Sequence, residues 1–175
     1  MIRKILLAIV LIFLITGIGF ASQDEIAFKN EPAGFRGLKW GDAPTEDMKF
    51  LGEINSSYNL YYRKDDKKNI GSAKLDNIFY RFNLYSNQFY DVSATFFGEA
   101  NYDILKIIFE EKFGKPTLKL KDGYSLIWNG ENAKISLTFN SKEWKGFFMI
   151  ISTKILPERP EDNKQKEVEK AEEDF

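Results

Sequence analysis

The sequence contains neither histidine nor cysteine. Without histidine, the Ser–His–Asp and Cys–His nucleophilic systems are excluded. Without both residue types, the usual zinc and iron ligand sets are missing, and no disulfide can support the fold. The sequence also has no P-loop and no GxGxxG pattern. We therefore expect no cofactor and no metal site, and a fold that depends on its hydrophobic core alone.

The acidic residues that remain do not suggest catalysis. Asp65 and Asp66 in "KDDKK" lack the spaced oxygen ligands of an EF-hand loop and favour a solvated turn between strands. Glu110 and Glu111 are neighbours along an expected helix and point in different directions. The sequence thus predicts a non-catalytic protein. The enzymatic alternative is a carboxylate-based hydrolase, which would need two carboxylates roughly 5–10 Å apart in a cleft.

The N-terminus is typical of a secretory signal peptide. Arg3 and Lys4 precede the apolar run Ile5–Ile15. Small residues at Gly19 and Ala21 fit a cleavage site that ends at residue 21. We therefore expect residues 1–21 to be a signal peptide and the protein to be periplasmic or secreted.

The alternative is an uncleaved anchor in the inner membrane. The uncharged stretch 5–21 has 17 residues, the short end of the range for a spanning helix. No cysteine lies near residue 21, so a lipoprotein anchor is excluded. Contact with the membrane is expected only through this segment, if it is not removed.

Charge separates a body from a tail. Residues 157–175 contain eight acidic and four basic residues, and few apolar ones, which predicts a charged and disordered tail. Residues 22–156 contain 18 acidic and 19 basic residues, a net charge of +1, and no linker divides them. This body is long enough for a single domain. Its near-neutral charge argues against a nucleic-acid partner.

The stretch "GFRGLKWGDAPTEDM", residues 34–48, indicates a turn followed by a helix. Asp42 is placed to cap a helix, and Pro44 is tolerated in its first turn. Met48 and Leu51 share one helical face, and the helix is expected to end near Gly52.

The residues before that cap have a structural interpretation. Gly37 and Gly41 permit tight turns, and Trp40 is expected to fill the core. The cap would occupy the N–H groups that an anion needs, so no phosphate site is expected. Arg36 and Lys39 are left as possible contacts to a partner.

Alternating apolar and polar residues predict strands at 58–63, 78–84 and 90–96. A three-residue loop joins the last two, with Asn87 in the left-handed conformation. The register chosen keeps the apolar residues on one face. It pairs Leu84 with Tyr90, Phe82 with Val92, and Tyr80 with Ala94.

The second half begins with a helix predicted from Asn101, its cap, to Gly114. Asn129-Gly130 then predicts a two-residue hairpin turn that pairs Leu126 with Ala133. The last strand starts at Phe147 and is apolar on both faces, so it must be paired or covered.

Together these elements predict an α+β fold with two layers. An antiparallel sheet would carry helices on one face. Residues 42–98 and 101–153 would each form a helix followed by three strands, which indicates a tandem duplication.

Several segments resemble a group of uncharacterised exported bacterial proteins. The segments are "FRGLKWGD", "IFYRF…NQFYDVSATFFG", "FEEKFGKP" and "IWNG", within residues 35–153. The expected element order is also similar to the β-lactamase-inhibitor-protein and BamE-type folds. That likeness implies binding or scaffolding rather than catalysis, and it carries over no functional residue.

Aromatic residues are the other candidate functional feature. Phe79, Tyr85 and Tyr61 are placed on the face that the helices would not cover. The leading hypothesis is a non-catalytic exported binding or accessory module that acts through this open sheet face or an edge strand, with an envelope protein as partner. The alternative is a small-ligand protein that binds a lipid or a sugar.

Overall fold

The computed structural model describes residues 28–121 and 123–157, and residues 164, 168, 169 and 171 of the tail. The predicted signal peptide lies outside the described residues, as does most of the predicted tail. The four described tail residues after position 157 are helical and exposed. No helix in the described part of the chain is long and apolar enough to cross a membrane.

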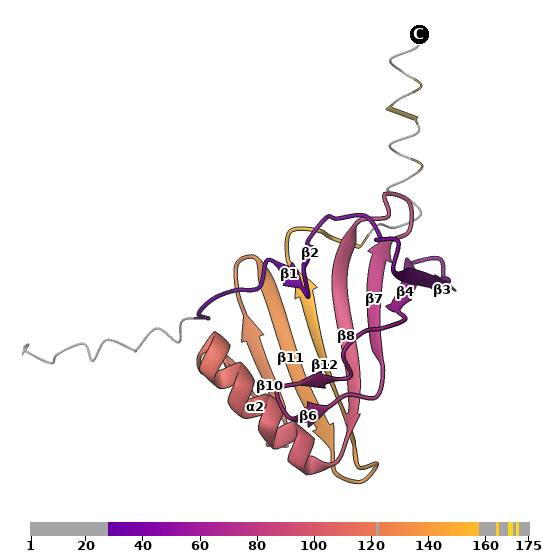
Figure 1. Ribbon diagram of the computed structural model, residues 1–175. Helices are drawn as coiled ribbons and strands as arrows, with labels where there is room; N and C mark the ends of the chain where they lie inside the picture. Colours follow the sequence, from indigo (N-terminus) through magenta and orange to yellow (C-terminus); the bar gives the residue numbers. More distant parts are fainter. Residues whose placement is uncertain (1–27, 122, 158–163, 165–167, 170, 172–175) are drawn as a thin grey trace, which may run out of the picture.

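Eight strands form one antiparallel sheet (Figure 1). It consists of two four-stranded meanders that meet where β8 pairs with β12. In spatial order the strands are β3 (Met48–Ile54), β4 (Tyr58–Arg63), β7 (Ile78–Asn83), β8 (Phe89–Phe97), β12 (Lys145–Ser152), β11 (Ala133–Asn140), β10 (Ser125–Asn129) and β9 (Leu118–Lys119).

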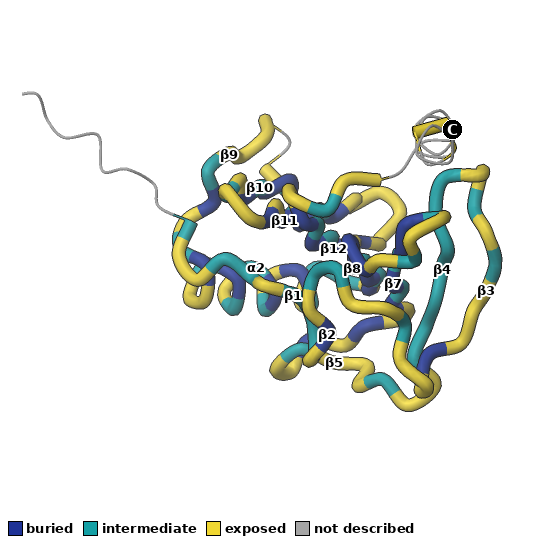
Figure 2. Tube along the Cα trace, turned by 90° about the horizontal axis from the view of Figure 1, so that it is seen from above, coloured by how far each residue is buried: buried dark blue, intermediate teal, exposed yellow. Residues whose placement is uncertain are grey.

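The helix α2 (Glu99–Phe113) connects the two meanders and packs against β8 and β11. Two small hairpins lie on the same face of the sheet (Figure 2). They are formed by β1 (Gly34–Phe35) with β2 (Leu38–Lys39), and by β5 (Asn69–Ile70) with β6 (Ala73–Lys74). The core lies between these segments and the sheet, and its largest fully buried side chains include Trp128, Tyr80, Phe82, Phe96 and Phe148.

A row of aromatic residues crosses the junction between the meanders. Gly146 on β12 pairs with Phe96 on β8 and with Phe139 on β11. The two rings are nearly parallel, 6.4 Å apart between centroids. A Cβ atom at position 146 would collide with the ring of Phe96. The glycine therefore lets the two rings meet above the central strand.

The predicted fold class was wrong. Within residues 28–121 and 123–157 the structure has one helix, not two, and strand is the dominant secondary structure. The expected first helix is instead a turn followed by the edge strand β3. The duplicated helix-plus-three-strand plan, on which the likeness to the BamE-type folds was based, is therefore absent.

The reason is tertiary pairing. The Asp42 side chain accepts a hydrogen bond from the N–H of Lys39 (2.7 Å), so it closes the preceding turn instead of capping a helix. The backbone at residues 41 and 42 exchanges hydrogen bonds with Phe89. The next segment, residues 48–54, pairs along its length with β4. This pairing outweighs the weak helical pattern of the segment.

The second helix was predicted correctly, apart from its start. It begins at Glu99, after Gly98, and ends at Gly114 as expected. Asn101 does not cap it. Its side chain donates to the carbonyl of Phe97 (2.7 Å) and accepts from the N–H of Lys74 (2.8 Å), so it ties the helix to β6.

The first predicted hairpin exists, and Asn87 has the expected left-handed conformation, with φ of 53°. Its register was wrong by two residues at Tyr80 and, beyond a bulge between Arg81 and Phe82, by three residues at Phe82. A bulge at this hairpin makes the observed pairs Phe82 with Phe89, Tyr80 with Val92, and Ile78 with Ala94. Because the pairing of Tyr80 shifts by an even number of residues, its side chain keeps the expected face.

The second predicted hairpin turns two residues later than expected, since Trp128 pairs with Ile135 and Leu126 with Leu137. The carboxylate of Glu31 accepts hydrogen bonds from the N–H groups of residues 131, 132 and 133. A distant side chain therefore stabilises this turn. The last strand, β12, is paired on both sides, as its apolar character required.

Candidate functional site

The face of the sheet opposite α2 carries a groove of about 580 Å³. On β8, Ser93 and Thr95 point into it, while Val92 and Ala94 face the core. The same alternation applies to β11 and β12. The groove is lined by Arg81, Ser93, Thr95, Thr138, Asn140, Glu143, Lys145, Gly146 and Phe147.

Most of the residues that line the groove have polar side chains, although apolar atoms make up the larger part of its exposed surface. Hydroxyl and amide side chains supply both donors and acceptors. The groove is lined by two cations, Arg81 and Lys145, and by one carboxylate, Glu143. Phe147 is 44% exposed, and it gives the groove one aromatic surface. Such a wall suits a polar ligand that also presents an apolar group.

Arg81 is held in place from below by a buried carboxylate. Its guanidinium lies 3.2 Å from Asp91 and donates to the hydroxyl of Ser93, also at 3.2 Å. The ring of Tyr58 lies against it, 5.2 Å from the guanidinium carbon. Asp91 is fully buried, and its Oδ1 has no hydrogen-bond partner among the described residues.

Burial raises the pKa of Asp91 to about 7, although the nearby charge of Arg81 works in the opposite direction. The carboxyl group is therefore partly protonated near neutral pH. Each time it gains a proton, Arg81 loses its neutralising partner and presents a net positive charge to the groove.

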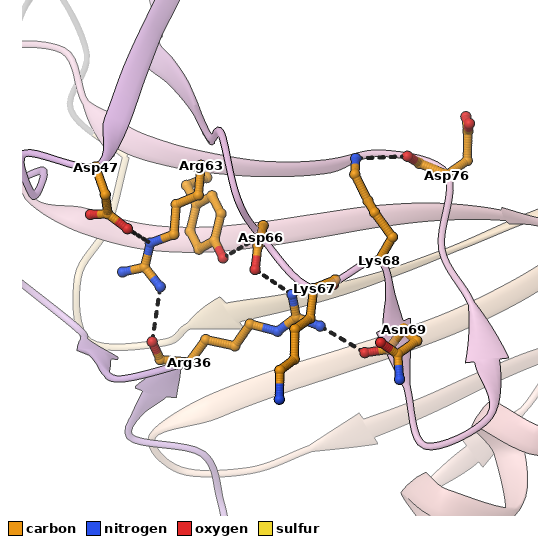
Figure 3. Close-up of polar contacts among 9 residues, drawn as sticks. Arg36, Asp47, Arg63, Asp66, Lys67, Lys68, Asn69 and Asp76 are labelled. Carbon is orange, nitrogen blue, oxygen red and sulfur yellow. Dashed lines mark hydrogen bonds and ion pairs between the residues drawn. The ribbon is translucent and has the colours of Figure 1, made fainter.

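A separate polar network fixes the β1–β2 hairpin to the rest of the domain (Figure 3). Arg36 lies in its turn with φ of 49°. Its guanidinium pairs with Asp66 and donates to the carbonyls of Lys67 (2.6 Å) and Asn69 (3.0 Å). Asp66 also accepts from the hydroxyl of Tyr80 (2.6 Å), and burial, together with this contact, raises the pKa of Tyr80.

The second half of the network comes from Arg63. It donates to the carbonyl of Arg36 (2.9 Å) and forms an ion pair with Asp47 (3.2 Å). The residues of this network enclose a polar hollow of about 340 Å³ that also includes Asp65. Asp47 and Asp66 are engaged by arginines. In the described ranges no cluster of three or more acidic residues could hold a metal ion.

The five residues proposed from the sequence do not form one site. Phe79 lies on the open face, where it pairs with Ser93. Tyr85 is exposed in the β7–β8 turn. Tyr61 lies on the other face, where its ring packs 4.9 Å from that of Phe82. Arg36 belongs to the internal network above, and Lys39 is exposed on β2.

Sequence reasoning missed the residues of the groove. Alternation in β8 marks Ser93 and Thr95 as facing away from the core. The contributions of Lys145 and Phe147 depend on β12 lying beside β8, and no local pattern indicates that pairing. A lone Asp between apolar residues at position 91 was the one available signal of a buried charge.

Comparison with known proteins identifies no relatives: no protein-family model, curated protein or solved structure matches the chain.

Replacing Asp91 with Asn should change how stability depends on pH. The folded-state pKa of Asp91 lies above its ordinary value, so the native state binds the proton more tightly than the unfolded state. The wild type consequently loses stability through this group as pH rises from about 4 to about 7. We expect D91N to gain stability relative to the wild type over that range, by roughly 2–4 kcal/mol.

Urea unfolding at several pH values measures this difference. Asp65→Asn, in the exposed turn, is the control and should show no such trend. A constant difference between D91N and the wild type from pH 4 to pH 8 would contradict the assignment.

Arg36→Ala should destabilise the domain by about 2–4 kcal/mol, because Asp66 would be left in a nearly buried position without its guanidinium partner. Lys39→Ala, three residues later on the exposed side of the same hairpin, should change stability by less than about 0.5 kcal/mol. Thermal or urea unfolding distinguishes the two variants. Equal effects would show that Arg36 is a surface residue like Lys39.

Proposed function

We propose that this protein is a non-catalytic binding module of the cell envelope, exported to the periplasm or secreted, which acts through the open face of its sheet. The observation that carries the proposal is the groove beside Arg81, which is placed between hydroxyl side chains on a face that no described helix covers. Phenylalanine and arginine side chains, such as those of Phe147 and Arg81 here, are enriched in protein–protein interfaces.

The occupant we propose is a segment of a partner protein that carries an acidic side chain. Its carboxylate would approach Arg81 and Lys145, and an adjacent apolar side chain would lie on Phe147. The buried Asp91 fixes the position of the Arg81 guanidinium before the partner arrives, and pre-positioned donors cost less to bring together. Protonation of Asp91 would further strengthen the attraction for a carboxylate.

Binding by addition of a partner strand at an edge of the sheet has less support. β9 has only two residues. β3 has seven residues, but a bulge lies between Phe50 and Gly52. Bulges and short strands are features that discourage another strand from pairing with an edge. We therefore place the partner on the face of the sheet and not at its edge.

A hydrolytic function has less support. The groove includes a single carboxylate, Glu143, whereas glycoside hydrolysis uses two. The carboxyl group with a raised pKa, Asp91, is fully buried and cannot reach a substrate directly. The polar hollow near Asp65 has more acids, but its arginines engage Asp47 and Asp66.

Affinity capture from the native envelope, followed by mass spectrometry, tests the proposal with two groove variants. Phe147→Ser removes the aromatic surface, and Lys145→Glu reverses one cationic charge. Each should reduce recovery of the partner by at least about tenfold, which corresponds to roughly 1.4 kcal/mol. The control is Ile107→Ser, because Ile107 is 60% exposed on α2, on the other side of the sheet.

The control should recover the partner within about twofold of the wild type, and circular dichroism should show all three variants folded. If both groove variants capture the same proteins as the wild type in the same amounts, the open face is not the binding surface.

A further inference from the structure

A second cavity lies on the helix side of the sheet, apart from the open-face groove. Its volume is about 350 Å³. One wall is α2, the opposite wall is formed by β1 and β5, and β12 supplies the floor. The lining residues are Pro32, Gly34, Phe35, Arg36, Ile70, Ile108, Phe109, Lys112, Phe113 and Ile150.

The inside of this cavity is apolar. Phe109, Phe113 and Ile150 belong to the buried core, and Ile108 and Ile70 pack against it. The ring of Phe109 lies 5.6 Å from that of Phe113. These side chains already hold one another in place, so an apolar body could enter without rearranging them. Its transfer from water would be favourable in proportion to the area that it buries.

Two cations stand among these apolar residues. Lys112 is exposed, and its ammonium lies 5.5 Å from the ring centre of Phe113. In the part of the chain that the structure describes, no carboxylate lies within ion-pair distance of Lys112. Because an ammonium group has three N–H donors and carries a full charge, it can bind an anion at this position.

Arg36 is the second cation that lines the cavity, and it is already engaged in hydrogen bonds. The guanidinium has five N–H donors. Among the described residues it donates hydrogen bonds to Asp66 and to the carbonyls of residues 67 and 69. These three bonds leave donors that can still approach a ligand. They also hold the group over the ring of Phe35, 5.1 Å from the ring centre.

We propose that this cavity binds a monomeric amphipathic carboxylate, with a single short apolar chain placed among the phenylalanine and isoleucine side chains and its carboxylate at Lys112. A cavity of 350 Å³ is near the lower limit for ligand pockets, so it suits one short chain and not the two acyl chains of a phospholipid. Lys112, for which the described residues supply no ion-pair partner, selects an acid over an alcohol or an amine of equal length. This site shares no lining residue with the open-face groove, so the two proposals stand or fall separately.

Decanoate is the probe for this proposal. It is titrated into the full-length protein while NMR follows the methyl signals of Ile108 and Ile150, one on a wall of the cavity and one on its floor. We expect both signals to shift and to saturate. Decan-1-ol and decyltrimethylammonium, which have the same chain length, should bind at least about tenfold more weakly. Vesicles of phosphatidylglycerol should leave both signals unchanged.

Variants at position 112 locate the anion. Lys112→Glu should weaken decanoate binding at least about tenfold, while Lys112→Arg should remain within threefold of the wild type. Lys115→Glu, with the same charge change just beyond the end of α2, should remain within twofold. Both positions are on the surface, and unfolding curves check that the three variants fold.

Four outcomes would overturn the proposal. Decan-1-ol could bind as tightly as decanoate, or Lys112→Glu could bind decanoate like the wild type. The methyl signals could stay unshifted by decanoate, or they could respond to the vesicles and not to the free acid. Loss of partner capture by the groove variants has no bearing on any of these results.

Discussion

The pairing of β8 with β12 is the interaction on which the rest of the structure depends. Seven residue pairs, from Lys145 with Phe97 to Ile151 with Asp91, join the two meanders into one sheet. Phe96 and Phe139 meet above Gly146 at this junction. β12 is the last strand in the described part of the chain, so the sheet is complete only when the chain returns to its centre. Long-range pairing of this kind forms after local contacts.

The two faces of the sheet at this junction differ in character. On one side, α2 and the two hairpins cover an aromatic core that has no disulfides. On the other side, the strands leave polar side chains beside Arg81 and a fully buried carboxylate beneath it. A buried Asp with one oxygen that no described residue hydrogen-bonds opposes stability. Its position is best explained by what it does for Arg81, which it holds in a fixed place at the groove.

Strongly periodic segments could be predicted from the sequence, whereas long-range pairing could not. α2 and the strands at 58–63 and 78–83 follow local patterns. Gly114 was correctly predicted to stop α2, and Asn87 to take the left-handed conformation in the β7–β8 turn. The segment after Asp42 has a helix start by composition, yet pairing with β4 makes it a strand. Glu31, which holds the turn at residues 131–133, lies about a hundred residues away. The groove could not be predicted for the same reason, because its walls come from strands that are distant in sequence.

The most direct test of the account is photo-cross-linking in the native envelope. A photoreactive phenylalanine analogue, p-benzoylphenylalanine, replaces Phe147 in the open-face groove or, in a parallel sample, Ile107 on the outside of α2. We predict a defined protein cross-link from position 147, none from position 107, and loss of the first when Lys145→Glu is added. A cross-link from position 107 alone, or none from position 147, would contradict the claim that this protein binds its partner through the open face of the sheet.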